Sequence, residues 1–260
     1  MKIYIMTDQE GVSGVDNPEM ILTDNPRITE AREYLTGDVN AAVDGAFAGG
    51  ATHVMVLDGH GSGVDNILWD KIDKRATRDT RPNRNWWSSL DSSYDATFFV
   101  GAHAMAGTMN GFLDHTQSSV SWHNYYVNGR LMGELGQWAL CAGHFGVPLV
   151  MVCGDEAAVV EAHAFFNPVE TAAVKRGVGR SSAVCVPLDE ARSRIRDAAQ
   201  RSMAHVGKAK PFTVALPAEI ILDLNRSDYA DSHAAAAGVE RITARRVRKV
   251  AATALDILPF

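Results

Sequence analysis

The sequence is short of cysteine and of long apolar runs, and each shortage excludes a class of protein. It holds 3 cysteines in 260 residues with no Cys-x-x-Cys spacing, which argues against a disulfide framework and a thiolate zinc site. No stretch approaches the roughly 18 consecutive apolar residues of a membrane-spanning helix. The apolar run at the start is too short for a secretory signal, so we expect a cytoplasmic protein with no membrane partner.

Excess positive charge is missing as well. The 25 basic residues are outnumbered by 31 acidic ones, and the net charge of −6 argues against nucleic acid or an anionic membrane as the main partner. The rest of the composition, 46% apolar and 22% charged, is that of a globular protein long enough to bury a core without a structural metal. Any metal that binds is therefore expected to serve chemistry.

Short apolar runs rich in β-forming residues alternate with helical patterns along the first part of the chain. The predicted strands cover residues 2–7, 52–57, 96–100 and 148–153. Helical patterns cover residues 26–48 and 130–143, and a third begins near Asp155. Strands that alternate with helices predict an α/β fold with a mostly parallel sheet flanked by helices.

The pattern of apolar and polar residues changes after about residue 165. Helical spacing recurs over residues 188–205 and strand-like alternation around 212–224, followed by a predicted strand near 242–247 and a helix over 249–258. We predict a metal-binding catalytic α/β core over residues 1–165. Residues 166–260 are expected to form a smaller C-terminal α+β lobe, either as a second domain or as a continuation of the first.

Polar side chains follow the first three predicted strands directly. Asp8 and Glu10 come after the first strand, Asp58 and His60 after the second, and His103 after the third. Ligands of open parallel sheets bind beyond the carboxyl ends of the strands, so these residues are expected at one edge. Oxygen and nitrogen donors without thiolate are typical of a catalytic Zn²⁺, Mn²⁺ or Co²⁺ site. Taken singly, each residue fits a turn former, a helix cap or a satisfied loop histidine equally well.

Further candidates come from the middle of the chain. Glu134 borders the apolar face of a predicted helix, where a half-buried carboxylate needs a metal, a salt bridge or the helix dipole as partner. His115 lies in a long polar loop and suits proton transfer near neutral pH. Trp86 and Trp87, in the loop over residues 79–91, fit a substrate pocket or a subunit contact.

On these residues the sequence resembles the D-aminopeptidase family of metallopeptidases. The family begins with a Ser-x-Asp-x-Glu-Gly signature, which is matched here from Met6 to Gly11 with Met6 in place of the serine. The resemblance spans nearly the whole chain and is weakest at the C-terminal end. It continues through Asp58-Gly-His60, Gly101-Ala-His103, His115, residues 126–136, 151–155 and 171–175.

The resemblance implies a binuclear zinc site, with Mn²⁺ or Co²⁺ as possible replacements. In it Asp8 bridges two metals per chain, Glu10 and His103 complete one, and His60 and Glu134 complete the other. It implies that His115 is catalytic. It further implies a homo-oligomer, a decamer of stacked rings whose central channel encloses the active sites.

We therefore predict a zinc aminopeptidase that hydrolyses short peptides or amino-acid amides, with D-residues at the amino end as one option. A metal-bridging water would attack the scissile carbonyl. The alternatives are another metal-dependent amidase, a two-metal phosphoesterase, or a non-catalytic small-ligand-binding protein; the sequence has no recognised phosphate-cradling glycine loop. Lys175 is a candidate to hold a substrate carboxylate, with a surface or interlobe charge as the alternative.

Overall fold

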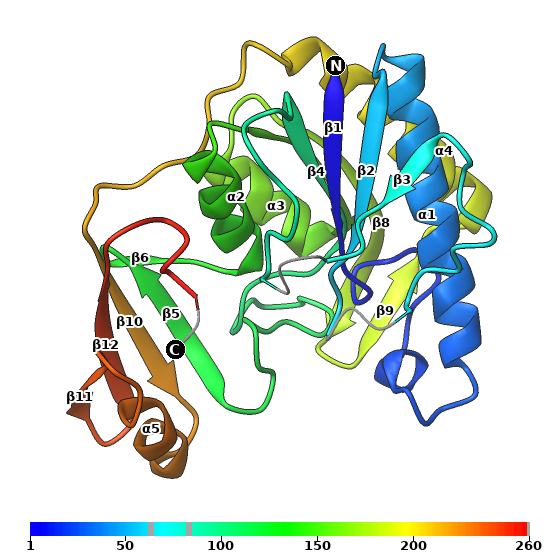
Figure 1. The fold of residues 1–260 in the computed structure, drawn as a ribbon. Helices are drawn as coiled ribbons and strands as arrows, with labels where there is room; N and C mark the ends of the chain where they lie inside the picture. Colours follow the sequence, from blue (N-terminus) through cyan, green and yellow to red (C-terminus); the bar gives the residue numbers. More distant parts are fainter. Residues whose placement is uncertain (62–64, 82–84, 259–260) are drawn as a thin grey trace.

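Two β-sheets lie side by side in the computed structural model, which describes residues 1–61, 65–81 and 85–258 (Figure 1). The larger sheet has the strand order β3-β2-β1-β4-β7-β8-β9, and all neighbours are parallel except the antiparallel pair β8–β9. Its strands are β1 (Lys2–Thr7), β2 (His53–Asp58), β3 (Ala76–Arg78), β4 (Ala96–Ala102), β7 (Leu149–Asp155), β8 (Glu170–Gly179) and β9 (Ser182–Cys185).

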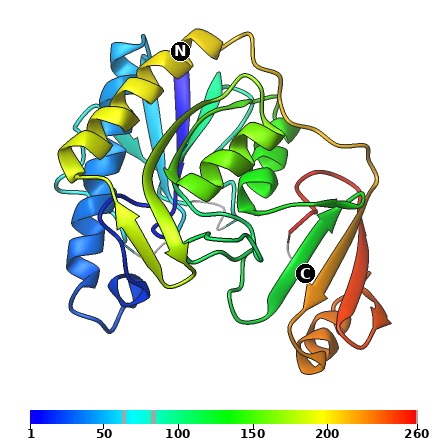
Figure 2. The same ribbon diagram turned by 180° about the vertical axis from the view of Figure 1, so that it is seen from behind.

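Helices cover both faces of the larger sheet, as Figures 1 and 2 show from opposite sides. On one face α1 (Ile28–Ala48) and α4 (Leu188–Ser202) pack against each other and over the strands. On the other face lie α2 (Glu134–His144) and α3 (Glu156–Phe165). This arrangement confirms the α/β class that the sequence predicted.

The smaller sheet is antiparallel throughout and has the order β11-β12-β10-β5-β6. Its elements are β5 (Trp122–Val127), β6 (Arg130–Leu131), β10 (Ala218–Leu224), α5 (Ser227–Ala234), β11 (Glu240–Thr243) and β12 (Arg246–Ala251). Short 3₁₀ turns lie at η1 (Pro18–Ile21) and η2 (Met203–His205). A separate apolar cluster, which includes Tyr125, Ile220 and Val247, forms the core of this lobe.

Apolar spacing explains the longest helix. Ala31, Leu35 and Val39 recur every four residues along α1 and are fully buried beneath its inner face. The helix ends at the Gly49-Gly50 pair, where Gly50 has a φ of +101° that other residues rarely adopt. The predicted helix over residues 26–48 is therefore confirmed to within two residues.

Two predicted helices are wrong in part or in full. The helix predicted from Arg130 begins only at Glu134, because Asn128 and Gly129, with φ of 50° and 78°, turn β5 back into β6. The helix predicted over residues 249–258 is absent: within the described chain, β12 runs to Ala251 and turns follow. Lys249 lies opposite Ile220 in the ladder with β10, so strand pairing overrides the helical spacing.

The chain passes between the sheets more than once. Strands β8 and β9 and helix α4, which follow residue 165, belong to the larger sheet and its cover. Strands β5 and β6, which precede it, belong to the smaller sheet. The sheets therefore do not separate at residue 165, and the predicted division into domains 1–165 and 166–260 stays a prediction.

All three cysteines are free thiols. Cys141 and Cys153 are buried and Cys185 is half-buried, and burial raises the pKa of the Cys141 thiol to about 12. These thiols are therefore poor nucleophiles. Among the described segments, no helix is long and apolar enough to cross a membrane.

Candidate metal centre

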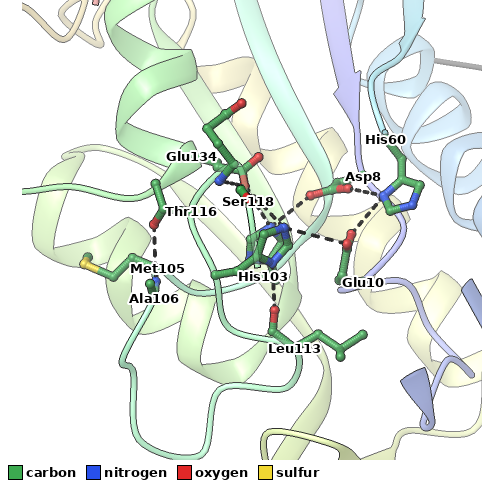
Figure 3. Close-up of polar contacts among 12 residues, drawn as sticks. Asp8, Glu10, His60, His103, Met105, Ala106, Leu113, Thr116, Ser118 and Glu134 are labelled. Atoms are coloured by element: carbon green, nitrogen blue, oxygen red, sulfur yellow. Dashed lines mark hydrogen bonds and ion pairs between the residues drawn. The ribbon is translucent and has the colours of Figure 1, made fainter. Parts of the chain in front are cut away.

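The carboxyl ends of β1, β2 and β4 meet at one edge of the larger sheet. Thr7 is level with Asp58 of β2 and with Val100 of β4, so the residues that follow these strands emerge together. The predicted quartet of Asp8, Glu10, His60 and His103 therefore lies in one cluster (Figure 3).

Glycines let the loops at this edge approach each other closely. The amide of Gly11 donates to the carbonyl of Gly101 at 2.8 Å. A Cβ on Gly11 would lie 1.9 Å from the Ala102 oxygen, and one on Gly101, whose φ is +85°, would lie 2.0 Å from the Asp8 oxygen. Only glycine fits either position, and the loop that carries Asp8 and Glu10 is held against the end of β4.

Asp8 lies at the centre of the cluster. Its Oδ1 is 2.9 Å from Nδ1 of His60, and its Oδ2 is 3.3 Å from Nε2 of His103. Glu10 approaches the same nitrogen of His60, with Oε2 at 3.1 Å. Asp8 therefore presents one oxygen to each of two imidazoles, as a bridging carboxylate would.

Glu134 completes the cluster from the first residue of α2. Its Oε1 accepts a hydrogen bond from the amide of Gln117 at 2.7 Å and lies 3.4 Å from Nε2 of His103. The same oxygen is 3.6 Å from Nε2 of His115, whose ring stacks on that of His103 with centroids 4.0 Å apart. The polar loop and the helix thus deliver the two residues that the sequence singled out beyond the strand ends.

Backbone contacts fix the orientation of two histidines. Nδ1 of His103 is 3.0 Å from the carbonyl of Ala104, and Nδ1 of His115 is 2.8 Å from that of Leu113. A nitrogen that faces a carbonyl donates its proton to it, so in the neutral ring Nε2 is the acceptor, and both rings turn this nitrogen toward the carboxylates. Nε2 of His103 is buried and makes no well-aligned hydrogen bond with any described residue. In that neutral form, Nε2 of His103 and the Asp8 oxygen 3.3 Å away are both acceptors, which need a proton or a metal ion between them.

The electrostatics of the cluster also favour a cation. Burial raises the pKa of Asp8, and the charge of Glu10 raises it further. Burial opposes the charged form of His60, yet the carboxylates of Glu10 and Asp8 outweigh it and raise the pKa of His60 well above its usual value. Asp8 and Glu134 have the same effect on the pKa of His103. Raised pKa values of buried histidines beside carboxylates mean that the cluster carries an excess of negative charge, which a bound cation would neutralise.

Ligand atoms converge closely enough to hold an ion in two places. One set joins Asp8, Glu10 and His103, and the other joins His103, His115 and Glu134, with the atoms of each set within 4.8 Å of one another. Carboxylate and imidazole donors without sulfur fit zinc in a catalytic role. Both sets contain His103, and the residues present fit a catalytic zinc site.

Two other sequence candidates lie outside the cluster. Asp58 accepts hydrogen bonds from the amides of Asn66 and Ile67, at 2.7 and 3.2 Å, and so ties these two residues to the end of β2. Lys175 is 2% exposed and is not among the described residues that line the cavity. Its Nζ donates to the carbonyls of Glu10 and Val15, so the predicted contact with a substrate carboxylate has no support in this arrangement.

A cavity of ≈ 380 Å³ opens directly over the cluster. Its described lining consists of Met6, Asp8, Glu10, Gly59, His60, Gly61, Trp86, His115, Gln117, Ser118, Ser119 and Glu134. Trp86 forms part of the wall and packs edge-on against Trp138, 5.9 Å away. Residues 82–84 of the loop predicted over 79–91 lie outside the described residues, but its Trp86 belongs to the pocket.

Met6 is a lining residue that the sequence reading did not select. It precedes Asp8 by two positions on an extended strand, so both side chains leave the same face of the sheet. The two-residue spacing between Met6 and Asp8 is the feature of the sequence that could have predicted this position for Met6. A larger cavity of ≈ 460 Å³ lies on the smaller sheet beside the ion pair of Asp223 and Arg246. This larger cavity contains neither of the two converging ligand sets, so the smaller cavity is the better candidate for a metal-dependent active site.

Comparison with known proteins shows which family the chain resembles. The sequence profile of the D-aminopeptidase family matches residues 1–260. A D-aminopeptidase from Bacillus subtilis (strain 168) is 31% identical over 235 residues, which is 89% of this chain and 84% of that protein. A solved structure, the Zn-dependent D-aminopeptidase DppA from Bacillus subtilis, a self-compartmentalizing protease, superposes with a TM-score of 0.93 at 28% identity, over 99% of this chain and 94% of that one.

Proposed function

The chain belongs to the D-aminopeptidase family and is thus a metallo-hydrolase of the aminopeptidase type, and from this premise we propose that it uses two zinc ions to cleave the first residue from short peptides or amino-acid amides. The observation that carries the proposal is the buried Nε2 of His103, which faces oxygens of Asp8 and Glu134 and in the neutral ring is an acceptor like them, because Nδ1 donates to the Ala104 carbonyl. A metal ion between them satisfies all three groups.

Five residues hold the metals in this proposal, and Asp8 is shared. His60 contacts Asp8 and Glu10, whereas Glu134 lies against His103. These contacts favour His60 with Glu10 at one position and His103 with Glu134 at the other, whereas the convergence of Asp8, Glu10 and His103 favours the division that the family resemblance implies, with Glu10 and His103 together. Zinc ions held by these residues would lower the pKa of a water toward neutrality, polarise the scissile carbonyl and offset the charge that develops on its oxygen.

His115 moves the proton in this proposal. The hydrogen bond from its Nδ1 to the Leu113 carbonyl leaves Nε2 free to accept, 3.6 Å from Glu134 and 4.0 Å from Glu10. A proton taken up at Nε2 during attack can be passed to the nitrogen of the leaving amine, which departs only when protonated. Stacking on His103 holds the ring in place for both transfers.

The cavity favours a short substrate with a free amine. Its ≈ 380 Å³ accommodates one or two amino-acid residues, and a carboxylate such as Glu10 can pair with the substrate ammonium group. Met6 and Trp86 give the wall an apolar side, which suits an apolar side chain on the first residue. The names of both relatives favour a D-residue at that position.

Charge distinguishes this proposal from phosphoester hydrolysis. None of the described residues that line the cavity is a lysine or an arginine, although phosphate chemistry relies on such cations to offset charge. A panel of D- and L-aminoacyl p-nitroanilides, a D-aminoacyl amide and bis-p-nitrophenyl phosphate tests the choice. We expect chelator-sensitive release of amine from the D-aminoacyl compounds. Cleavage of the phosphodiester alone would contradict the proposal.

We also propose that the chain forms a homo-oligomer, as the related self-compartmentalizing protease suggests, and that it reaches the decamer which the family resemblance implies. Light scattering on the purified protein tests this, and a mass near that of one 28.1-kDa chain would contradict it. The cytoplasmic location stays a prediction that cell fractionation tests.

A further inference from the structure

Lys175 is a lysine enclosed in the core directly behind the metal cluster. Its side chain is 2% exposed, and its Nζ donates to the backbone carbonyls of Glu10 and Val15, both at 2.6 Å. The ammonium group also lies 4.7 Å from the centre of the Phe112 ring, a cation–π contact. Lysine is almost never fully buried unless it is paired, so this placement needs a reason.

The two carbonyls belong to the loop that leaves β1 and carries the metal cluster. Glu10 supplies a carboxylate to the cluster, and Val15 lies five positions further along the same loop. A cation that accepts no hydrogen bond of its own can join two carbonyls that would otherwise repel each other. Lys175 thereby ties both parts of the loop to β8, on the side away from the cavity.

Other contacts hold this loop at different points. The amides of Asp8 and Gly11 donate to carbonyls of β4, each at 2.8 Å, and Ser13 donates its hydroxyl to Asp38 at 2.5 Å. Among the hydrogen bonds of the described residues, the bond from Lys175 is the one that fixes the peptide group of Glu10 through its carbonyl. The position of that carbonyl sets the direction in which the Glu10 side chain leaves the backbone.

We propose that Lys175 is a positioning residue, which holds the Glu10 carboxylate in place for metal binding through its hydrogen bond to the Glu10 carbonyl. The proposal rests on the metal site of the proposed function. It replaces the substrate contact predicted for this lysine, because the ammonium group points into the core and acts through Glu10. Groups that orient metal ligands typically contribute about 10- to 100-fold to metal affinity.

The test compares zinc affinity in two variants of neighbouring residues on β8. Lys175→Met keeps the apolar stem but removes the charge and the donors, whereas Val174→Ala trims a residue that is 1% exposed in the apolar core. Both variants are expected to melt at lower temperature than the wild type. Competition with a chromophoric chelator measures zinc affinity, and we expect Lys175→Met to lose at least tenfold at one of two sites and Val174→Ala to lose less than twofold.

A double-mutant cycle separates positioning from general loosening of the fold. Glu10→Gln removes the charge of the carboxylate that Lys175 is proposed to orient. If Lys175 acts through Glu10, adding Lys175→Met to Glu10→Gln weakens zinc binding by less than a further twofold, since the oriented ligand is already lost. A full additional tenfold loss would overturn the proposal, as would equal zinc losses in Val174→Ala and Lys175→Met.

Three further results bear on the proposal. If Lys175→Met does not fold, Lys175→Ala carries the same comparison, because water can then enter and hydrate the two carbonyls. If wild-type protein binds no zinc, the proposed function fails. If wild-type, Val174→Ala and Lys175→Met proteins bind zinc equally, the proposed function stands and the role of Lys175 is refuted.

Discussion

Replacement of His115 by alanine distinguishes the proposed metal ligands from the group that we propose moves the proton. The ring lies with Nε2 3.6 Å from Glu134 and 4.0 Å from Glu10, while its Nδ1 is held by the Leu113 carbonyl. Loss of a positioned acid–base group costs about 10²- to 10⁴-fold in rate, which corresponds to about 3–5 kcal/mol of transition-state stabilisation. The five proposed ligands remain, so we expect two zinc ions per chain in His115→Ala.

The leaving group sharpens this prediction. The amine of an amide or peptide must be protonated before it departs, whereas p-nitroaniline is a far weaker base that departs more easily. His115→Ala should therefore lose more in kcat/KM on a D-aminoacyl amide than on the matching p-nitroanilide. Elemental analysis of the same samples counts zinc. The control is His163→Ala, which removes an exposed histidine whose Nε2 contacts Thr171, and it should leave both measurements unchanged.

Two results would refute the assignment of His115. Normal rates in His115→Ala on both substrates would mean that the ring takes no part in the reaction. Loss of one zinc together with turnover would mean that His115 acts as a ligand, as its convergence with His103 and Glu134 permits.

Three further predictions concern the cluster and the fold around it. Glu134→Ala should hold one zinc per chain by elemental analysis, since its oxygen lies 3.4 Å from Nε2 of His103, and two would contradict the account. Gly11→Ala places a Cβ 1.9 Å from a backbone oxygen and should cost about 1–3 kcal/mol of unfolding free energy in urea, whereas wild-type stability would refute the close approach. Arg246 holds the pKa of Asp223 below its usual value, so the pair stabilises the fold above about pH 4 and this contribution is lost as pH falls further. In Asp223→Asn the unfolding free energy should therefore fall less steeply below about pH 4 than in the wild type, with a difference of about 0.5–1 kcal/mol, and an acid dependence equal to that of the wild type would contradict this.

The strand ends of the larger sheet were predictable because parallel strands place their carboxyl ends together. Asp8, Glu10, His60 and His103 each follow an apolar run directly, so the alternation of strands and helices was enough to bring them to one edge. Glu134 was predictable as a half-buried residue of a helix. Its distance from His103 was not, because it depends on how α2 packs on the sheet.

Other features depend on contacts between residues that are remote in sequence. The C-terminal segment has helical spacing, yet it forms β12 because β10 offers a partner strand at Ile220. From the sequence Lys175 is a candidate substrate contact or surface charge, and only its burial and its hydrogen bond to Glu10, 165 residues away in the chain, support the positioning role that we propose. Neither effect leaves a signal in local periodicity.

The central claim is that a pair of zinc ions in the strand-edge cluster performs the hydrolysis. Its most direct test is to strip the purified protein with a chelator, return zinc in measured equivalents, and follow cleavage of a D-aminoacyl amide. The account predicts no turnover without metal and a rise that reaches its plateau at two zinc ions per chain. Full turnover after complete removal of metal would contradict it.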